Sequence, residues 1–343
     1  MRRIESVEIF RLIAITAVIA IHVQPFQGFS FENGSDRHLF IIINQLARFA
    51  VPFFFVVSGY FWGIKIRNAV SSEDISYPMM KKIFMIFVFW SIIYVLPYNI
   101  FSISEIGWYK LLTSSYWKIR DIYEHPVRSL MEGSKVYLWF FVALLYSVGI
   151  SQIFLKYKLE GWLIFFAIAL YLFGVFAKAY SETSFGIRIQ FDTRNGPFFG
   201  TIFFVTGYFL SRYNPTNRWF ILGIGCFLFG TVLHFIELYV ISRIYGGYLV
   251  QDFCLGTYFM GVGVAIAALS NCSFLRNRVL QIIGKFTLGI YASHFLFIEM
   301  LGPIRHLYNS AFWEIAFVSI VLTLSIVFVI TLSKINTFRS FVQ

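Results

Sequence analysis

The chain has 343 residues, of which 58% are hydrophobic and 13% are charged, and this composition excludes an ordinary soluble domain. The net charge of +11 is compatible with nucleic-acid binding, but the basic residues are scattered between apolar runs, as in the loops of multi-pass membrane proteins. We therefore expect no nucleic-acid partner. No polar stretch is long enough for a separate soluble domain, so we expect one integral-membrane domain over residues 1–343.

Apolar segments close to the roughly 20 residues that span a bilayer recur along the whole chain. They lie at about 7–27, 39–63, 81–101, 135–155, 161–180, 197–211, 218–241, 248–270, 282–302 and 311–333. The sequence therefore predicts an all-α polytopic membrane protein with about ten transmembrane helices. No small-residue cleavage site follows the first segment, so we expect it to be retained. Lys and Arg are more frequent in the loops on the side of the N-terminus, which predicts that both termini are cytoplasmic.

Within the first segment, the stretch from Ile9 to Phe26 contains two ionisable residues, Arg11 and His22, that membrane insertion does not require. Such a side chain at membrane depth costs about 2.5–3.5 kcal/mol on insertion scales, which favours a functional role. Their spacing of eleven residues places both on one helix face, about 20° from alignment and roughly 16 Å apart. An imidazole can accept a proton near neutral pH, so His22 is a candidate general base. The alternatives are a His22 that packs between helices and a structural ion pair of Arg11 with Glu8.

Basic residues also occur in the second segment and in the loop that follows it. Arg48 lies near the outer end of the second segment, where it either contacts a substrate or extends its charge toward the membrane surface. Arg67, Lys81 and Lys82 flank the next loop. Because the chain has no Gly-rich phosphate loop, a phosphate-bearing ligand would have to use these inner cations. The positive-inside rule accounts for them equally well.

Two longer segments are predicted on the outer side of the membrane. Residues 102–134 carry aromatic side chains among Lys and Arg, including Trp117, and residues 181–196 carry the charged residues Glu182, Arg188, Asp192 and Arg194. Aromatic faces beside hydrogen-bonding groups suit a carbohydrate, so Trp117 is a candidate acceptor contact. An interfacial aromatic belt is the alternative interpretation.

Residues 55–61 (Phe-Val-Val-Ser-Gly-Tyr-Phe) and 203–209 (Phe-Phe-Val-Thr-Gly-Tyr-Phe) form an imperfect repeat. Small residues at such positions allow helix backbones to approach closely. The repeat is either a remnant of duplication or a product of convergence, and we assign it no function.

Three ionisable residues in the later segments, His234, Glu237 and His294, are further candidates. His234 and Glu237 are one helical turn apart, so Glu237 either faces an acceptor hydroxyl or forms a local hydrogen-bonded pair with His234. His294 is a second intramembrane imidazole. The three cysteines, Cys226, Cys254 and Cys272, lack metal-type spacing, and the chain contains neither a His-Glu-x-x-His pair nor a Gly-x-Ser-x-Gly elbow. We therefore expect no metal and no tightly bound cofactor.

Four motifs occur in order along the chain. They are Glu8-x-x-Arg11 followed by His22, the run from Arg48 to Tyr60 (Arg-Phe-Ala-Val-Pro-Phe-Phe-Phe-Val-Val-Ser-Gly-Tyr), Tyr137-Leu-Trp-Phe-Phe-Val-Ala-Leu-Leu-Tyr146, and Gly284-Lys-Phe-Thr-Leu-Gly-Ile-Tyr-Ala-Ser-His294. With these motifs the chain resembles the acyltransferase-3 family of polytopic membrane acyltransferases. Glu8 occupies a position at which the family more often has aspartate. Tyr137 occupies the position before Leu-Trp-Phe, at which the family often has histidine. The pair Lys81-Lys82 replaces an arginine-rich cluster, which weakens any bidentate phosphate contact.

The resemblance implies transfer of an acyl group, usually acetyl, from cytoplasmic acyl-CoA to a hydroxyl of an extracytoplasmic glycan. Typical acceptors are lipid-linked or surface polysaccharides such as the O-antigen of lipopolysaccharide. No hydrolase-like domain follows the last segment, so the resemblance is to the stand-alone form in a bacterial inner membrane, where acetyl-CoA is a co-substrate. Other acceptors, including small molecules, and a secondary transporter are the alternatives.

These considerations give each candidate residue an expected role. His22, Arg11 and Glu8 are expected to be catalytic. The donor is expected to contact Arg11 together with Arg67, Lys81, Lys82 and Ser58, and the acceptor is expected to contact Arg48, Glu237 and Trp117.

Overall fold

The computed structural model describes residues 5–29, 36–99, 103–270, 282–305, 308 and 310–342, so Cys272 lies outside the described residues. These ranges are helical and contain no β-strand. The helices are α1 (Glu5–Val23), α2 (Asp36–Leu46), α3 (Ala50–Arg67), α4 (Glu73–Val95), α5 (Ile103–Glu124), α6 (Pro126–Glu132), α7 (Trp139–Lys156), α8 (Glu160–Phe176), α9 (Pro197–Leu210), α10 (Arg218–Tyr245), α11 (Leu255–Leu269), α13 (Thr287–Met300), α14 (Gly302–Arg305), α15 (Ala311–Ser333) and α16 (Asn336–Val342). Short 3₁₀ turns, Ala47–Phe49 and Val136–Leu138, precede α3 and α7.

Within the described ranges, six helices are long and apolar enough to cross a membrane. They are Glu5–Val23, His38–Arg67, Glu73–Val95, Val136–Lys156, Arg218–Tyr245 and Ala311–Ser333. Three shorter apolar helices accompany them, Glu160–Phe176, Pro197–Leu210 and Leu255–Leu269. The prediction of a helical, multi-pass membrane protein is confirmed, and each of these nine helices overlaps a predicted apolar segment.

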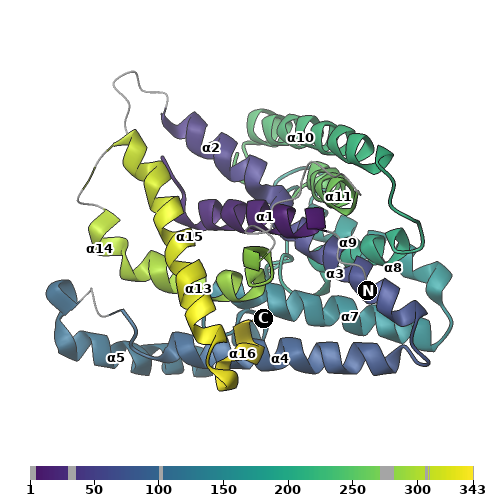
Figure 1. The fold of residues 1–343 in the computed structure, drawn as a ribbon. Coiled ribbons are helices and arrows are strands. Elements are labelled where there is room, and N and C mark those ends of the chain that lie inside the picture. The colour runs from purple at the N-terminus through teal and green to yellow at the C-terminus, as the bar shows by residue number, and fades with distance from the viewer. Residues whose placement is uncertain are drawn as a thin grey trace.

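Helix α1 lies at the centre of the bundle, where it packs against α3, α11, α13 and α15 (Figure 1). On one side α4 packs against α7, and α7, α8 and α9 pack against one another. On the other side α10 pairs with α11. Arg11 and His22 of α1 therefore lie among other helices and not on the outer surface of the bundle.

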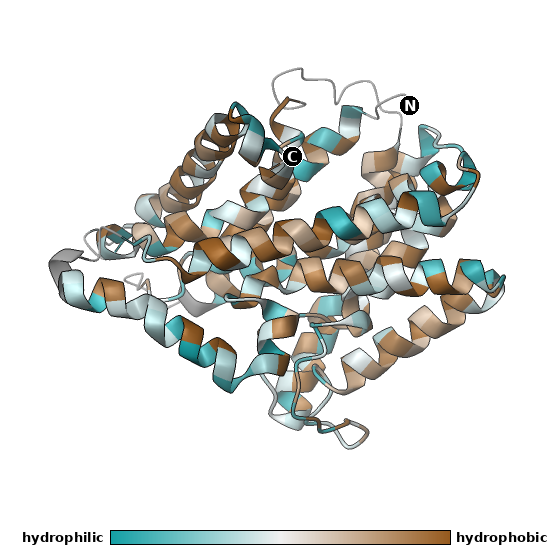
Figure 2. Cartoon of the chain, turned by 90° about the horizontal axis from the view of Figure 1, so that it is seen from below, coloured by the Kyte–Doolittle hydropathy of each residue, from teal (hydrophilic) through white to brown (hydrophobic). Residues whose placement is uncertain are grey.

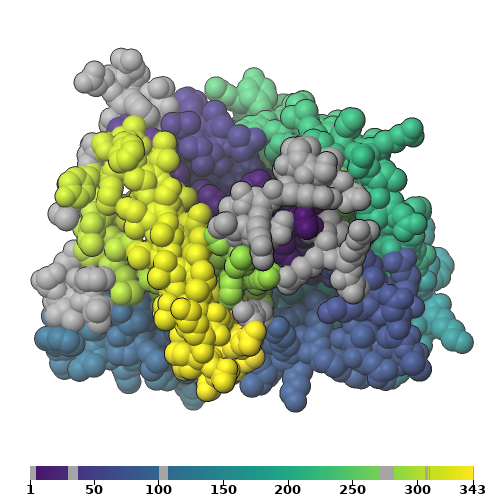
Figure 3. Space-filling view, viewed as in Figure 1, coloured from purple at the N-terminus to yellow at the C-terminus, as the bar shows by residue number. Residues whose placement is uncertain are grey.

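The peripheral helices expose apolar side chains. Exposed residues on α10 include Ile221, Leu222 and Val232, and those on α15 include Phe312 and Ile315. Figure 2 shows hydrophobic residues along most of the length of the helices, and Figure 3 shows α15 at the surface of the molecule. Apolar surface on this scale is typical of helices that face lipid, because soluble monomers rarely expose it.

Two predicted segments are displaced along the chain. The segment predicted at 81–101 is helix α4, Glu73–Val95. The segment predicted from residue 248 becomes helical at Leu255, because Gly246 ends α10 in the left-handed conformation and the chain then continues as a loop. The first turn of α11 is fixed by Glu237, whose carboxylate accepts the N–H groups of Leu255 at 2.9 Å and Gly256 at 2.6 Å. The loop before α11 is thereby held close to the interior of the bundle, and it carries Asp252.

Candidate functional site

Two cavities lie at the two ends of α1. The Arg11 cavity has a volume of about 330 Å³ and includes Arg11, and the His22 cavity has a volume of about 230 Å³ and includes His22. Both residues were predicted to share one face of this helix, and the structure places each of them in a cavity. The two cavities are separate, and a path between them along α1 stays a prediction.

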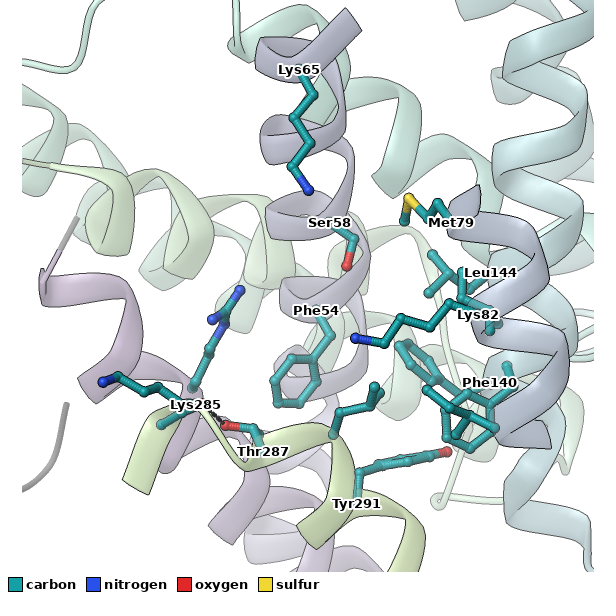
Figure 4. Close-up of a pocket in the computed structure, with 16 residues that line it drawn as sticks. Phe54, Ser58, Lys65, Met79, Lys82, Phe140, Leu144, Lys285, Thr287 and Tyr291 are labelled. Atoms are coloured by element: carbon teal, nitrogen blue, oxygen red, sulfur yellow. Dashed lines mark hydrogen bonds between the residues drawn. The ribbon is translucent and has the colours of Figure 1, made fainter. Parts of the chain in front are cut away.

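The Arg11 cavity combines cations with an apolar interior (Figure 4). Its polar lining consists of Arg11, Ser58, Lys65, Lys82, Lys285 and Thr287, and its apolar lining is contributed by α3, α4, α7 and α13. Figure 4 shows the Lys65 and Lys82 side chains extending into the cavity from different helices. Four cations around an apolar interior suit a ligand with an anionic head and an uncharged arm.

Arg11 is held by Glu8, as the sequence suggested. The Arg11 guanidinium donates to both Glu8 carboxylate oxygens, at 3.0 and 3.2 Å, and lies 5.8 Å from the centre of the Phe61 ring. Glu8 is buried, whereas Arg11 keeps about a quarter of its side chain exposed. Glu8 therefore orients Arg11, and Arg11 presents its charge to the cavity.

The structure does not bring Arg67 and Lys81 to this cavity, although both were predicted to contact the donor. Helical phase explains the difference. Ser58 and Lys65 are seven residues apart on one face of α3, whereas Arg67 is about 200° further around that helix. Likewise Lys82 shares its face of α4 with Ile86, and Lys81 points elsewhere. Lys65 and Lys285 line the cavity in their place.

The His22 cavity contains a network of paired charges. Arg48 donates to Asp252 at 2.8 Å and to the Asn44 side-chain oxygen at 2.9 and 3.2 Å. Arg194 and Lys178 approach the other Asp252 oxygen at 3.3 and 2.8 Å. Arg48 therefore lines the predicted cavity, but Asp252 and Asn44 fix its orientation.

Asp252 stays ionised in this network. Burial alone would raise the pKa of its carboxyl, but Arg194, Arg48 and Lys178 outweigh burial and hold that pKa well below its usual range. The cavity therefore keeps a fixed negative charge beside its cations at any physiological pH.

Three aromatic or imidazole rings surround His22. The ring centroids of His294, Phe295 and Tyr137 lie 5.3, 5.6 and 6.1 Å from that of His22. Nδ1 of the buried His294 lies 2.6 Å from the carbonyl oxygen of Tyr291. Because a carbonyl only accepts, Nδ1 carries the proton and Nε2 is left with a lone pair. Within the described residues that buried Nε2 has no hydrogen-bond partner.

Tyr291 of α13 lines both cavities. Its side chain is buried, and its hydroxyl donates to the carbonyl oxygen of Tyr137 at 2.5 Å. The Tyr137 ring in turn stacks on Phe295, 4.0 Å between centroids. Tyr291 therefore lies where the two chambers meet.

Two predicted acceptor contacts lie elsewhere. Glu237 caps α11 and also accepts from the Tyr180 hydroxyl at 2.5 Å, so its carboxylate is occupied by the fold. Trp117 lies on α5 with an exposed ring and an Arg120 guanidinium 5.3 Å from its centre. Neither residue lines the His22 cavity, and we no longer assign them to the acceptor.

His234, Glu237 and Cys254 form a buried cluster whose potential ligand atoms lie within 4.8 Å of one another. Hydrogen bonds already engage this cluster. His234 contacts the Gln45 amide oxygen at 2.9 Å and the Thr257 hydroxyl at 3.2 Å. The cluster joins α10 to α11, and we assign no metal to it.

Comparison with known proteins identifies a domain over most of the chain. Residues 4–332 match the acyltransferase domain family named Acyl_transf_3. The chain is 28% identical over 244 residues to an amino-acid racemase of Enterococcus faecalis, a match that covers 66% of this chain and 31% of the relative. It is 26% identical over 227 residues to a serine/alanine racemase of Enterococcus gallinarum, a match that covers 59% of this chain and 28% of that relative. The chain thus spans about a third of the length of these relatives. No solved structure gives a significant match.

Proposed function

The chain belongs to the acyltransferase-3 family of membrane acyltransferases, and from this premise we propose that it transfers an acetyl group from cytoplasmic acetyl-CoA to a hydroxyl of an extracytoplasmic glycan. The acceptor is a lipid-linked or surface polysaccharide such as O-antigen, and the protein lies in the inner membrane of a bacterium. The observation that carries the proposal is the pair of cavities at the two ends of α1, one rich in cations and the other containing an imidazole.

The Arg11 cavity suits the donor. Coenzyme A carries a nucleotide with several phosphates and a long, uncharged pantetheine arm. Lys65, Lys82 and Lys285 would bind the phosphates together with Arg11, and the apolar interior would receive the arm. In its extended form that arm is about as long as the Arg11–His22 separation of roughly 16 Å, so the thioester can reach the junction between the cavities. Ser58, which also lines the cavity, is positioned to contact the arm.

The His22 cavity suits the acceptor hydroxyl. His22 would remove the hydroxyl proton while the hydroxyl oxygen bonds to the thioester carbonyl carbon. Arg48, held by Asp252 and Asn44, would stabilise the negative charge on the carbonyl oxygen. The carbon–sulfur bond then breaks, and the imidazolium returns its proton to the thiolate of coenzyme A. The products are the acetyl ester and free coenzyme A, so no other reactant is needed.

The same geometry sets the topology that we propose. The Arg11 cavity opens toward the cytoplasm, where acyl-CoA is made, and the His22 cavity faces the outside. This arrangement requires a cytoplasmic N-terminus, which the loop charges favour, and the full topology would be about ten spans with both termini inside.

A small hydroxyl compound is the second candidate acceptor. The His22 cavity has a volume of about 230 Å³ and presents Arg48 and Asp252 side by side, a combination that suits a molecule with both charges. The relatives named as amino-acid and serine/alanine racemases are much longer than the matched region. A hydroxy amino acid such as serine is nevertheless an acceptor with suitable size and charge.

Sealed inside-out vesicles provide the test. Vesicles that contain the protein and enclose acceptor glycan are given labelled acetyl-CoA on the outside, and lumenal glycan acetylation is measured by mass spectrometry. We expect acetylated glycan inside and free coenzyme A outside, in equal amounts. Transfer to enclosed serine and not to glycan would favour the second candidate. If wild-type protein releases no coenzyme A with either acceptor while a labelled solute crosses the vesicle membrane, the protein is a transporter and the proposal is wrong.

A further inference from the structure

Tyr291 separates the two cavities. Among the residues that the structure describes, it alone contributes to the lining of both. Its ring packs against Phe140 and Phe141 of α7, with ring centroids 5.0 and 5.7 Å apart. Figure 4 shows Tyr291 at the end of the Arg11 cavity opposite Lys65. The ring therefore forms the deep end of the chamber whose other end carries the cations.

The Tyr291 side chain is also fixed in place. Its hydroxyl donates to the Tyr137 carbonyl at 2.5 Å, and the Tyr291 carbonyl accepts from Nδ1 of His294 at 2.6 Å. Tyr137 and His294 are both neighbours of His22. The Tyr291 ring cannot turn away without breaking the buried hydrogen bond of its hydroxyl, which costs more than breaking one in water.

We propose that Tyr291 is a specificity-determining residue that limits the length of the acyl group. This inference rests on the proposed function. A thioester that enters from the cationic end directs its acyl group at the Tyr291 ring, and the acyl carbon must pass beside that ring to meet a hydroxyl near His22. An acetyl group ends where the ring begins. Each additional methylene overlaps the ring. In other closed apolar pockets such an overlap lowers kcat/KM by roughly 10–200-fold.

The experiment compares acetyl-, butyryl- and hexanoyl-CoA as donors for wild-type protein and four variants. Tyr291→Ala removes the ring, and Tyr291→Leu removes part of it and serves if the alanine variant does not fold. Tyr291→Phe keeps the ring but loses the hydrogen bond to Tyr137. Phe199→Ala is the matched control, because Phe199 is a buried aromatic residue that lines only the His22 cavity.

The measured quantity is the ratio of kcat/KM for butyryl-CoA to that for acetyl-CoA. We expect this ratio to rise by roughly tenfold or more in Tyr291→Ala, to rise less in Tyr291→Leu, and to stay near the wild-type value in Tyr291→Phe and Phe199→Ala. The inference is wrong if Tyr291→Ala and Tyr291→Leu slow all donors equally, or if Phe199→Ala changes the ratio as much as they do. Failure of wild-type protein to use any of the three donors would instead contradict the proposed function.

Discussion

Gly59 of α3 and Gly207 of α9 make a reciprocal contact. A Cβ atom at Gly59 would lie 1.9 Å from the carbonyl oxygen of Phe204, and one at Gly207 would lie 1.9 Å from that of Val56. In each helix the contacted carbonyl lies three residues before the glycine. The two similar segments, 55–61 and 203–209, therefore pack against each other in equivalent ways, and this contact requires a glycine in both.

Gly207→Ala should destabilise the protein, because the added methyl group meets backbone atoms that cannot move aside like a side chain. We expect a loss of about 1–3 kcal/mol, as for other overpacked sites. Gly161→Ala on α8 is the control, because no atom lies within 4 Å of its Cβ position, and alanine there should be neutral or stabilising. Thermal unfolding in detergent compares the two variants. Equal unfolding temperatures for both would contradict the close contact.

Lys82→Ala should weaken donor binding, whereas Lys81→Ala should not. The two lysines are adjacent in sequence, but only Lys82 lines the Arg11 cavity. Loss of a charge-assisted contact to a phosphate is expected to raise the KM for acetyl-CoA about tenfold. Lys65→Ala and Arg67→Ala form a second matched pair on α3. Steady-state kinetics would refute the assignment if both members of each pair behaved alike.

His22→Ala should abolish measurable acetyl transfer without reducing the amount of protein in the membrane. General-base catalysis is worth roughly 10²–10⁴-fold in rate. His234→Gln is the control, since His234 is a buried intramembrane imidazole that lines neither cavity. Turnover of purified His22→Ala near the wild-type rate would remove His22 from the mechanism.

His294 should act as a positioning residue for His22. Its unpartnered Nε2 can accept a hydrogen from the neighbouring ring, because a centroid separation of 5.3 Å allows two ring nitrogens to approach hydrogen-bond distance. His294→Phe should therefore lower kcat with little change in the KM for acetyl-CoA. His294→Gln, which restores an acceptor, should recover part of the rate. A role in packing alone predicts equal losses in kcat and in protein abundance for both variants.

Asp252→Asn should remove the ion pairs with Arg48 and Arg194 and destabilise the fold by about 3 kcal/mol, the lower value typical of breaking a buried ion pair. The pKa of Asp252 is depressed in the folded protein, so its stabilisation is fully present above about pH 4, the ordinary value of an unfolded aspartate. That stabilisation declines as the pH falls from there toward the folded pKa. The stability difference between wild type and Asp252→Asn should thus be constant from pH 8 to about pH 5 and shrink below about pH 4. A difference that grows on acidification would contradict this assignment.

The sequence by itself determined the membrane class, most helices and the pair at the centre of the site. Length and hydropathy identify spans such as α1, because lipid excludes any backbone that is not internally hydrogen-bonded. The helical period also fixes how Arg11 lies relative to Glu8 and His22, since all three belong to one helix. These relationships are local, and the structure reproduces the Glu8–Arg11 ion pair.

Only the tertiary structure decided which side chains from other helices join that pair. The rotation of a helix about its axis depends on its neighbours. Both faces of a membrane helix are apolar, so hydrophobicity does not reveal which face of α3 turns toward the cavity. Only the packing decides that Lys65 lines the cavity and Arg67 does not. Arg48 and Arg194 come from separate parts of the chain and both pair with Asp252 of a third, contacts that no local pattern encodes. Tyr291 lines both the Arg11 cavity and the His22 cavity because the packing of α13 against α1 and α7 places it between them.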